Sequence, residues 1–336
     1  MTVRLYIFVY VFCQDYCSKL KKVTMELIEN IDQINSPFKN AVITIGNFDG
    51  VHKGHQSLFR QVIEKAGQIN GLSVVMTFDP HPLKALGISG PALITRRDQK
   101  LELIESCGID ILLCIPFDKS FASITAHDFI KDILVNKIGT KAIIIGADYS
   151  FGKDRQGNID LLRKEGDKLG FETIVSSWTN DSVQERISST RIREIVMAGK
   201  VDQAMKYLGR HYQIRGKVIK GRERGGSQLG FPTANIKLYD ELCPKHGVYA
   251  VTVETIKGNF WGVANIGFSP TFGDQMFTIE VHILDFNHDL YNSRIRVNMV
   301  EKLRDEKRFS GIHELSEQIK KDIEIAKDIL KKNGHS

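Results

Sequence analysis

The chain has 336 residues, of which 42% are hydrophobic and 26% are charged, and its formal net charge is +6. This composition is typical of a folded globular protein and excludes a largely disordered one, while the length predicts two domains. The lysines and arginines are scattered among the acidic residues, so the positive charge suits small anionic ligands and argues against nucleic acid as a partner.

Residues 1–24 form an N-terminal extension that we expect to be dispensable. Residues 5–13 are apolar, but only Arg4 carries a charge ahead of them and the run is far too short to span a bilayer, so we expect no membrane as a partner. Met25 could equally begin the folded protein, and the sequence leaves the start of translation open. The five cysteines include no CxxC pair, which indicates free thiols and a cytoplasmic location.

A buried strand that ends in a tight turn is predicted at residues 41–50. Residues 41–45 are apolar and rich in β-branched side chains, and turn formers follow at residues 46–50. Apolar residues then recur at helical spacing from about residue 55, so His52 and His55 lie at a helix N-terminus, where free amides and the helix dipole favour anions. The predicted phosphate site also includes Gly46, Asn47, Phe48 and Asp49.

The two histidines have other interpretations. Side chains of this kind three residues apart could bind a metal or cap a surface loop. A metal site would need a third ligand nearby, and neither a cysteine nor a glutamate at the zinc-protease spacing follows.

Further strands are predicted at residues 72–78, 109–115 and 142–145, with helical patterns between them. Strands that alternate with helices predict a parallel α/β sheet, in which ligands bind beyond the carboxyl ends of the strands. Asp148 and Phe151 follow the last of these strands in a segment that imitates a phosphate-binding loop. Five residues separate its glycines where four are needed, so it is not a Walker motif.

Residues 187–193 read Ile-Ser-Ser-Thr-Arg-Ile-Arg and open a helix that we expect to run from residue 190 to about residue 208. The hydroxyls of Ser189 and Thr190 can cap helix amides, and Arg193 offers a planar fork of donors to a phosphate. As a bare string the segment predicts only a helix cap.

The second domain is predicted to be a small antiparallel β-barrel. Strand patterns cover residues 212–218, 247–256, 260–266, 278–286 and 293–300, and turn residues at 257–259 and 287–289 are typical of tight hairpins. An amphipathic helix at about residues 313–331 should pack against the barrel. The predicted domains therefore span residues 25–209 and 210–336.

Residues 221–235 are rich in glycine and arginine, a composition that can bring amides and guanidinium groups to polyphosphate. The candidate ATP-binding residues here are Gly221, Arg224, Gly230, Thr233 and Asn235. The Thr233 hydroxyl and the Asn235 amide could also complete a Mg²⁺ shell. Glu280 alternates along a strand with apolar neighbours and shares a face with His282. A carboxylate in this place could act as a base, although by itself the pattern is typical of a solvated carboxylate on a half-exposed strand.

The motifs of both domains resemble those of the bifunctional riboflavin kinase/FAD synthetase family. The histidine segment and residues 187–193 resemble the HxGH and ISSTxxR motifs of nucleotidyltransferases, and the Gly-Phe-Pro-Thr-Ala-Asn run at residues 230–235 resembles the riboflavin kinase module. The resemblance extends from about residue 41 to residue 331. It implies a Rossmann-like adenylyltransferase domain with a parallel sheet, followed by a barrel-shaped kinase domain with a terminal helix.

The resemblance also implies roles for individual residues. His52, His55 and Arg193 would stabilise charge on the transferred phosphate, and Glu280 would be the catalytic glutamate of the kinase. Thr233 and Asn235 would handle Mg²⁺ and ATP. Asp148, Phe151 and Arg304 would contact or border the flavin. The implied substrates are ATP, riboflavin and FMN.

Three alternatives stay open at this point. The chain could retain a single activity, or it could be an HxGH nucleotidyltransferase with another acceptor, which would leave the second domain unexplained. A flavin-sensing protein without catalysis is the third, although the intact motif residues argue against it. The oligomeric state cannot be predicted.

Overall fold

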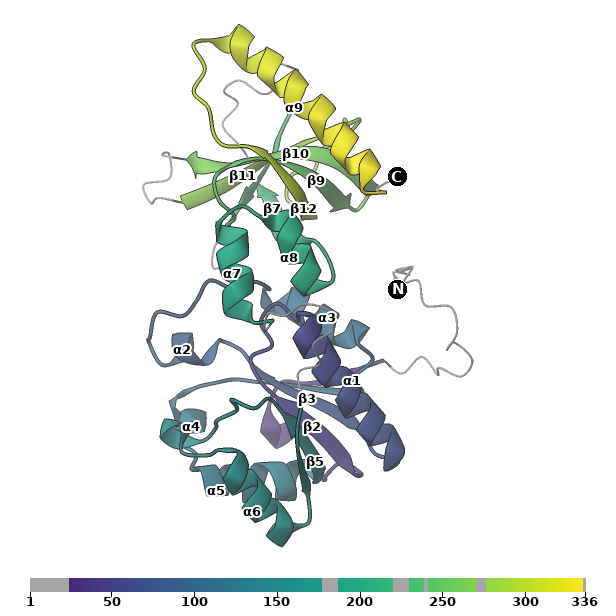
Figure 1. Cartoon of the computed structure of the whole chain (residues 1–336), viewed down its shortest axis with the longest axis vertical. Coiled ribbons are helices and arrows are strands. Elements are labelled where there is room, and N and C mark those ends of the chain that lie inside the picture. Colours follow the sequence, from purple (N-terminus) through teal and green to yellow (C-terminus); the bar gives the residue numbers. More distant parts are fainter. Residues whose placement is uncertain (1–23, 177–186, 220–229, 239–240, 270–275, 335–336) are drawn as a thin grey trace.

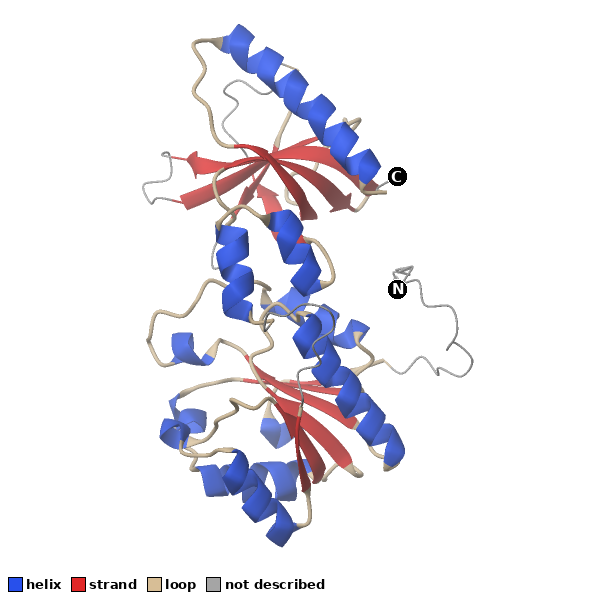
Figure 2. Ribbon diagram, in the orientation of Figure 1, coloured by secondary structure: helices blue, strands red, loops and turns tan. Residues whose placement is uncertain are grey.

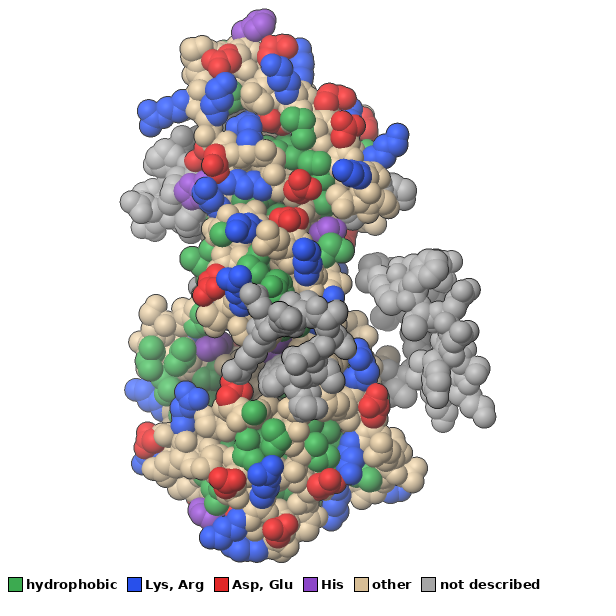
Figure 3. Space-filling model, viewed as in Figure 1, with side chains coloured by type: hydrophobic (Ala, Val, Ile, Leu, Met, Phe, Trp, Pro, Cys, Tyr) green, Lys and Arg blue, Asp and Glu red, His purple; other side chains and the backbone are tan. Residues whose placement is uncertain are grey.

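The structure is a computed structural model that describes residues 24–176, 187–219, 230–238, 241–269 and 276–334. Almost all of the predicted extension at residues 1–24 lies outside these residues, and so do Gly221 and Arg224 of the predicted ATP site. Two domains follow one another along the long axis of the molecule, with helices α7 (Ser189–Met197) and α8 (Val201–Leu208) between them (Figure 1). Basic and acidic side chains are interspersed over the face shown in Figure 3.

The first domain contains a six-stranded sheet in the order β1-β4-β3-β2-β5-β6, and every pairing is parallel. Its strands are β1 (Glu26–Ile28), β2 (Ala41–Ile45), β3 (Ser73–Phe78), β4 (Ile111–Ile115), β5 (Thr140–Ile145) and β6 (Glu172–Val175). The predicted parallel α/β domain is confirmed. The sequence patterns missed β1 and β6, which are the two short edge strands.

Helices cover both faces of this sheet (Figure 2). On one face α1 (Lys53–Gln68) and α3 (Arg97–Ser106) bury apolar side chains against residues such as Val42 and Val75. On the other face the π-helix at Phe129–Ile138 and α6 (Ile159–Leu169) pack against Ile43 and Met76. Alternate strand residues thus enter two separate cores, as a sheet covered on both sides requires. Short helices complete the domain: α2 (Pro82–Ala85), α4 (Lys119–Ala122), α5 (Ala126–Asp128) and 3₁₀ turns at Ile31–Gln33 and Lys153–Arg155.

The single helix predicted from residue 190 to residue 208 is wrong. The chain forms α7 and α8 instead, with Gly199 between them at a φ of +80°. A left-handed residue of this kind ends a helix, and glycine adopts that conformation without steric cost. The apolar spacing continues across the break because both helices bury residues in the same core.

The second domain is a closed barrel, as predicted. Its strands follow one another in the order β10-β11-β8-β7-β12-β9. Its strands are β7 (Tyr212–Ile219), β8 (Ala234–Lys237), β9 (Gly247–Thr255), β10 (Gly258–Ser269), β11 (Met276–Ile283) and β12 (Arg294–Arg304). The sequence analysis did not predict β8. The terminal helix α9 (Ile312–Lys332) covers an outer face of β9, β10 and β12 through a separate apolar cluster.

One of the two predicted hairpins is confirmed and the other is wrong. Strands β9 and β10 pair directly across a short turn before Gly258. Strands β11 and β12 do not pair with each other, because β11 lies between β10 and β8 while β12 lies between β7 and β9. Residues 287–289 have turn chemistry, but closure of the barrel decides the pairing.

The α7–α8 pair joins the two domains. Its apolar residues, including Ile192 and Leu208, belong to the same buried cluster as the interior of the barrel. Ion pairs also cross the junction, with Arg96 on Glu241 at 2.9 Å and Arg215 on Glu102 at 2.8 Å. The barrel therefore packs on α7, α8 and the start of α3, and the boundary at residue 209 stays a prediction.

We expect the pair between Arg304 and Asp322 to stabilise the barrel. Arg304 donates to both carboxylate oxygens of Asp322, whose side chain is only 4% exposed. Asp322→Ala should lower the free energy of unfolding of this domain by about 3 kcal/mol, because it leaves a guanidinium without its partner. Urea unfolding can be followed through Trp261 in a Trp178→Phe background, where it is the only tryptophan.

The control variant is Glu317→Ala, which removes an exposed partner of Lys320 on the same helix. That change should alter the free energy of unfolding by less than about 1 kcal/mol. Equal midpoints for the two variants would contradict the stabilising role of Asp322.

Candidate functional site

The histidine loop, residues 46–55, connects β2 to the first turn of α1. Three of its residues have left-handed backbone angles, with φ of +47° at Phe48, +86° at Gly50 and +38° at Val51. Such angles cost about 1–3 kcal/mol each for residues other than glycine and persist only where surrounding contacts impose them. The loop is therefore held in its shape by the rest of the domain.

Those contacts reach the loop carbonyls one after another. The Asn47 carbonyl accepts from Lys100 and Thr77, the Asp49 carbonyl accepts from Ser189 at 2.9 Å, and the Gly50 carbonyl accepts from Arg210 at 2.8 Å. The other two carbonyls of residues 47–51 accept bonds as well. The Phe48 carbonyl accepts from the Val51 amide, and the Val51 carbonyl accepts from the side chains of Gln56 and Arg210. Side chains from β3, α1, α3, α7 and the domain junction thus bind the carbonyl side of the loop.

The amide side is different. Within the described residues, the backbone amides of Asp49, His52, Lys53 and Gly54 have no protein acceptor. His52 is the N-cap of α1, and the first amides of a helix have no partner inside it. This row of free donors at a positive helix end is a site for an anion.

The two histidine rings stack on each other, with centroids 3.5 Å apart. His52 is only 2% exposed, and its Nδ1 accepts the His55 amide at 3.3 Å. The accepting Nδ1 must be deprotonated, so the proton of the neutral His52 ring lies on Nε2. The edge of His55 meets Phe48, which is itself buried against Phe59.

Both rings are neutral at neutral pH. Burial, followed by the charge of Arg210, lowers the pKa of His52 to about 4. Burial also lowers the pKa of His55 well below its ordinary value, and the stacked His52 ring adds to the effect. The histidines can therefore donate hydrogen bonds to a phosphate without themselves carrying charge.

The Asp49 carboxylate, which we predicted to contact ATP, forms hydrogen bonds within the protein. Its buried carboxylate accepts from the amides of Ile94 and Thr95 and from Arg193, whose Nη2 lies 2.6 Å from Oδ2. Arg193 also donates through Nε to the Ala92 carbonyl, and Nη1 has no partner among the described residues. Asp49 thus holds Arg193 beside the loop.

The structure brings the second motif to the histidine loop. The predicted capping is performed by Ser188, whose side chain accepts from the Arg191 amide, while Ser189 binds the loop carbonyl and Thr190 is exposed. Gly46 lies directly against Phe48, because a Cβ added there would come within 3.0 Å of the ring. Asn47 lies at the open side, where its amide is 3.2 Å from Nε2 of His81.

Sequence reasoning missed Lys100 as a neighbour of this site, whereas His81 belongs to the polar turn after the predicted strand at residues 72–78, at the sheet edge where ligands are expected. Lys100 is only 8% exposed, and its ammonium donates to the Asn47 and Phe78 carbonyls and to the Thr77 hydroxyl. Burial lowers the pKa of Lys100 and of His81. Lys100 carries no sequence signal, since a lysine in an amphipathic helix is ordinarily solvated.

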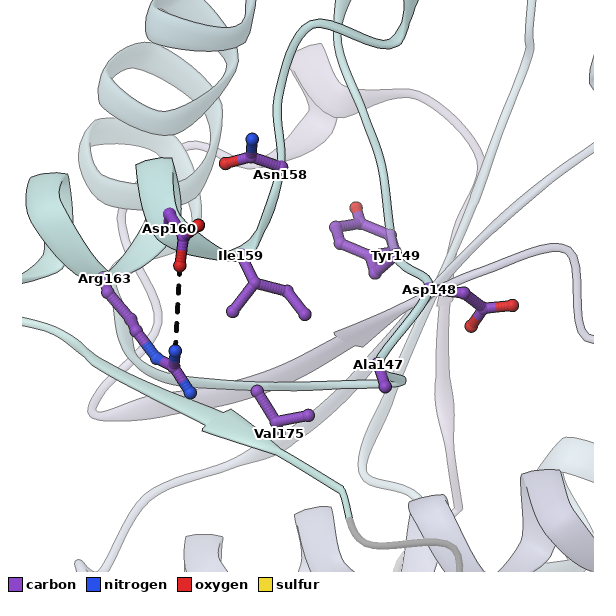
Figure 4. A pocket seen from close by; sticks show the side chains of 8 residues that line it. All are labelled: Ala147, Asp148, Tyr149, Asn158, Ile159, Asp160, Arg163 and Val175. Atoms are coloured by element: carbon purple, nitrogen blue, oxygen red, sulfur yellow. Dashed lines mark ion pairs between the residues drawn. The ribbon is translucent and has the colours of Figure 1, made fainter.

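A pocket of about 430 Å³ lies beyond the ends of β5 and β6 (Figure 4). Tyr149 and Asp148 contribute to its lining, and the Asp148 carboxylate points away from the other side chains drawn. Phe151 is not in the lining. It is buried, stacks on Tyr149 and packs near Phe129. Phe151 therefore contacts the pocket through Tyr149, whose ring it helps to hold in place.

In the barrel, the predicted kinase residues come together on neighbouring strands. Asn235 of β8 is the register partner of Glu280 of β11, which in turn faces Asn265 of β10. The alternate residues Ile279 and Val281 point into the barrel core. Asn235, Glu280 and Asn265 therefore form one polar row on the outer face, as the predicted alternation requires.

Glu280 and His282 differ in their surroundings. Glu280 is exposed, yet the protein around it removes enough water to raise the pKa of its carboxyl group. The ring of His282 is 2.9 Å from the Pro232 carbonyl and meets Phe231 edge-on, so it orients the Gly230–Asn235 segment. Gly230 has a φ of +82°, a conformation that favours glycine.

A second pocket, of about 450 Å³, is lined in part by residues of the barrel core such as Val281, and none of the three residues of the polar row lines it. Its lining also includes Pro232, Thr233, Phe286, Leu290 and Tyr291. The mixture of apolar walls with a few polar groups is typical of small-molecule sites.

Arg304 is occupied within the barrel. Besides its contact with Asp322, its Nη1 donates to the Asp305 carbonyl, and the guanidinium lies 5.7 Å from the Phe309 ring. Its predicted place beside the flavin stays a prediction.

Among the described residues there is no cluster of three or more His, Cys, Asp or Glu side chains that could hold a metal ion.

Comparisons with known proteins identify both domains. The family model for FAD synthetase matches residues 34–191, and the model for riboflavin kinase matches residues 208–330. A bifunctional riboflavin kinase/FMN adenylyltransferase of Buchnera aphidicola subsp. Schizaphis graminum is 41% identical over 90% of this chain and 98% of its own length. The protein of that name from Escherichia coli K12 is 40% identical over 91% of this chain and 98% of its own.

A solved structure has the same fold. It is named as a macrolide-efflux protein from Streptococcus pneumoniae, is 33% identical, covers 91% of this chain and 99% of its own, and has a TM-score of 0.81. In the part of the present chain that the structure describes, no helix combines the length and the apolar character needed to cross a membrane. The two family models match successive parts of the chain and the names of the curated relatives state both activities, so the chain belongs to the family of bifunctional riboflavin kinases/FMN adenylyltransferases.

Proposed function

We propose that the histidine loop catalyses adenylyl transfer from ATP to FMN and that the Glu280 face of the barrel makes this FMN from riboflavin and a second ATP. The observation that carries the proposal is the two-sided histidine loop. The carbonyls of residues 47–51 accept hydrogen bonds from the protein, while four free amides of the loop and two neutral imidazoles remain to bind a polyphosphate.

In the adenylation step, an FMN phosphate oxygen attacks the α-phosphorus of ATP. The new P–O bond forms as the bond from the α-phosphorus to the bridging oxygen breaks, and pyrophosphate leaves with the electron pair. Negative charge grows on the oxygens around the α-phosphorus and on the leaving group. The Nε2 proton of His52, the His55 ring and the free Nη1 of Arg193 are donors placed for this charge.

The pocket behind Tyr149 is suited to one of the ring systems of the adenylation step. It combines apolar residues with Asn158 and Arg163, and it lies at the carboxyl end of β5, the parallel neighbour of the strand that leads into the histidine loop. We assign it to the flavin, in keeping with the predicted roles of Asp148 and Phe151.

In the kinase step, a ribityl hydroxyl of riboflavin attacks the γ-phosphorus of ATP, the bond from the γ-phosphorus to the bridging oxygen breaks, and ADP leaves with the electron pair. Glu280 accepts the hydroxyl proton, and its raised pKa makes it a better base than an ordinary glutamate. The pocket of about 450 Å³ beside Thr233 is proposed for the adenosine of this ATP.

The residues beside Glu280 suit Mg²⁺, which prefers oxygen ligands. Asn235, the register partner of Glu280, offers an amide oxygen, and Thr233 offers a hydroxyl two residues earlier in the chain. The Asn235 amide nitrogen donates to the Thr233 carbonyl at 3.4 Å. When bound, Mg²⁺ would neutralise charge on the β- and γ-phosphates. Gly221, Arg224 and Gly230 are proposed to help bind these phosphates.

We also propose a cytoplasmic location. The described cysteines, Cys107, Cys114 and Cys243, are free thiols, as expected in a reducing compartment.

The two active sites should be separable by mutation within one chain. Glu280→Gln should lower kcat for FMN formation by about a hundredfold or more, because the base is lost. The same protein should convert supplied FMN to FAD at the parental rate. Both rates can be measured by chromatography of flavins after incubation with ATP and Mg²⁺.

His52→Ala should give the opposite pattern. FMN formation should continue, while FAD formation should fall by about a hundredfold through loss of a donor to the developing charge. Normal FAD formation by this variant, or normal FMN formation by Glu280→Gln, would overturn the corresponding assignment.

Thr233→Val should raise the Mg²⁺ concentration needed for half-maximal kinase activity, because it removes one oxygen ligand without changing side-chain shape. The Mg²⁺ dependence of FAD formation from supplied FMN serves as the internal control and should not change. An unchanged Mg²⁺ requirement for the kinase would exclude Thr233 as a ligand.

The neutral state of His52 can be tested by titration. Its NMR midpoint in the free protein should lie near 4 rather than 6.5, with His52→Ala providing the assignment. The folded chain binds this proton less readily than the unfolded chain. The neutral His52 ring therefore makes its full contribution to the free energy of unfolding above pH 6.5. As the pH falls toward 4, the free energy of unfolding decreases by up to about 3 kcal/mol. A midpoint near 6.5 would contradict neutral-histidine catalysis.

A further inference from the structure

Arg210 lies at the junction of the two domains, between the end of α8 and the start of β7. Its Nη2 donates to the Gly50 carbonyl at 2.8 Å, and its Nη1 lies 3.4 Å from the Val51 carbonyl and 3.3 Å from the Leu208 carbonyl. One guanidinium thus bonds two successive left-handed residues of the histidine loop. The two bonded carbonyls come 160 and 159 residues earlier in the chain.

Gln56 repeats the same connection from α1. Its amide donates to the Val51 carbonyl at 2.8 Å and to the Leu208 carbonyl at 3.1 Å. Both side chains therefore link the loop to the end of α8, and the Val51 carbonyl receives donors from both. The part of the loop directly before His52 is fixed by the junction.

The charge of Arg210 is not balanced by a carboxylate. Its described partners are all backbone carbonyls, and its Nε is buried without an acceptor among the described residues. Burial, followed by the nearby charge of Arg215, lowers the pKa of Arg210 to about 10. A cation in this state destabilises the fold, and such groups concentrate at functional sites.

The other arginines of the junction differ on this point. Arg96 pairs with Glu241, and both Arg215 and Arg296 pair with Glu102. A guanidinium that served only to attach the domains would be expected to pair in the same way. Arg210 instead directs its donors to the loop that presents His52.

We propose that Arg210 is a positioning residue for adenylyl transfer, which fixes the strained carbonyls of Gly50 and Val51 so that the following amides and the His52 ring keep their direction toward the phosphates of ATP. The inference rests on the function proposed for the histidine loop. It also makes a residue within the segment that matches the riboflavin kinase model a part of the support for the other site.

Loss of these bonds should act on the reaction more than on substrate binding. The Gly50 carbonyl would lose its only side-chain donor among the described residues, and the left-handed angles would lose a constraint. A displacement of about 1 Å in a catalytic group can cost about a hundredfold in rate. We therefore expect kcat for FAD formation to fall by about 10- to 100-fold in Arg210→Ala, with a smaller change in KM for ATP.

The experiment compares the full-length parent with Arg210→Ala, Arg210→Lys and Arg296→Ala. FAD formation from supplied FMN, FMN formation from riboflavin and the NMR titration of His52 are measured for each. Arg296 is the matched control, because it bonds Glu102 across the same junction and has no bond to the loop among the described residues. Its replacement by alanine should leave both activities at the parental rate.

Arg210→Ala should lose FAD formation, keep FMN formation and raise the His52 midpoint above about 4, since Arg210 is one of the charges that lower this pKa, together with Arg193. Arg210→Lys should recover only part of the rate, because one ammonium cannot replace a fork that spans three carbonyls. If Arg210→Ala does not fold, Arg210→Lys decides alone.

Three results would overturn the proposal: FAD formation within twofold of the parent in the variant that folds, an equal fall in both activities in that variant, or an unchanged His52 midpoint in a folded Arg210→Ala protein. A parent that makes no FAD would instead contradict the function proposed for the loop. The two failures are therefore distinguishable.

Discussion

The carboxylate of Asp49 accepts hydrogen bonds from the amides of Ile94 and Thr95 and the guanidinium of Arg193 at the same time. Its partners come from the segment before α3 and from α7, while Asp49 itself follows β2. One buried anion thus assembles three elements around the end of the central strand. Because Asp49 and the Ala92 carbonyl bond only Nη2 and Nε of Arg193, the guanidinium can still offer Nη1 to a ligand.

The electrostatics of the histidine loop follow from this arrangement. Lys100 and Arg210 bring two further cations to its carbonyl side, and neither has a carboxylate partner among the described residues. The rings of His52 and His55 stay neutral because burial and these charges oppose protonation. The site therefore holds a positive charge that a polyphosphate would compensate, and the protein accepts a loss of stability to keep it.

The two domains share more than a linker. Helix α7 contributes Ser189 and Arg193 to the surroundings of the histidine loop. Both α7 and α8 bury their apolar faces in the core of the barrel, which carries Glu280. Ion pairs from α3 to the barrel strengthen the same junction. This packing is why we expect Arg210, which belongs to neither motif, to influence adenylyl transfer while the kinase reaction continues.

The parallel sheet, the barrel, the helix at the histidines and the alternation that exposes Glu280 can all be predicted from the sequence, because they depend on apolar spacing and turn residues within short segments. Both motif pairs can be recognised there as well. The inward turn of Asp49, the bond of Arg304 to Asp322 and the contacts of Lys100 and Arg210 with the loop appear only in the folded chain. These contacts join residues far apart in the chain, so no local pattern records them. The break at Gly199 and the missing hairpin at residues 287–289 have the same cause, since packing and barrel closure overrode locally plausible patterns.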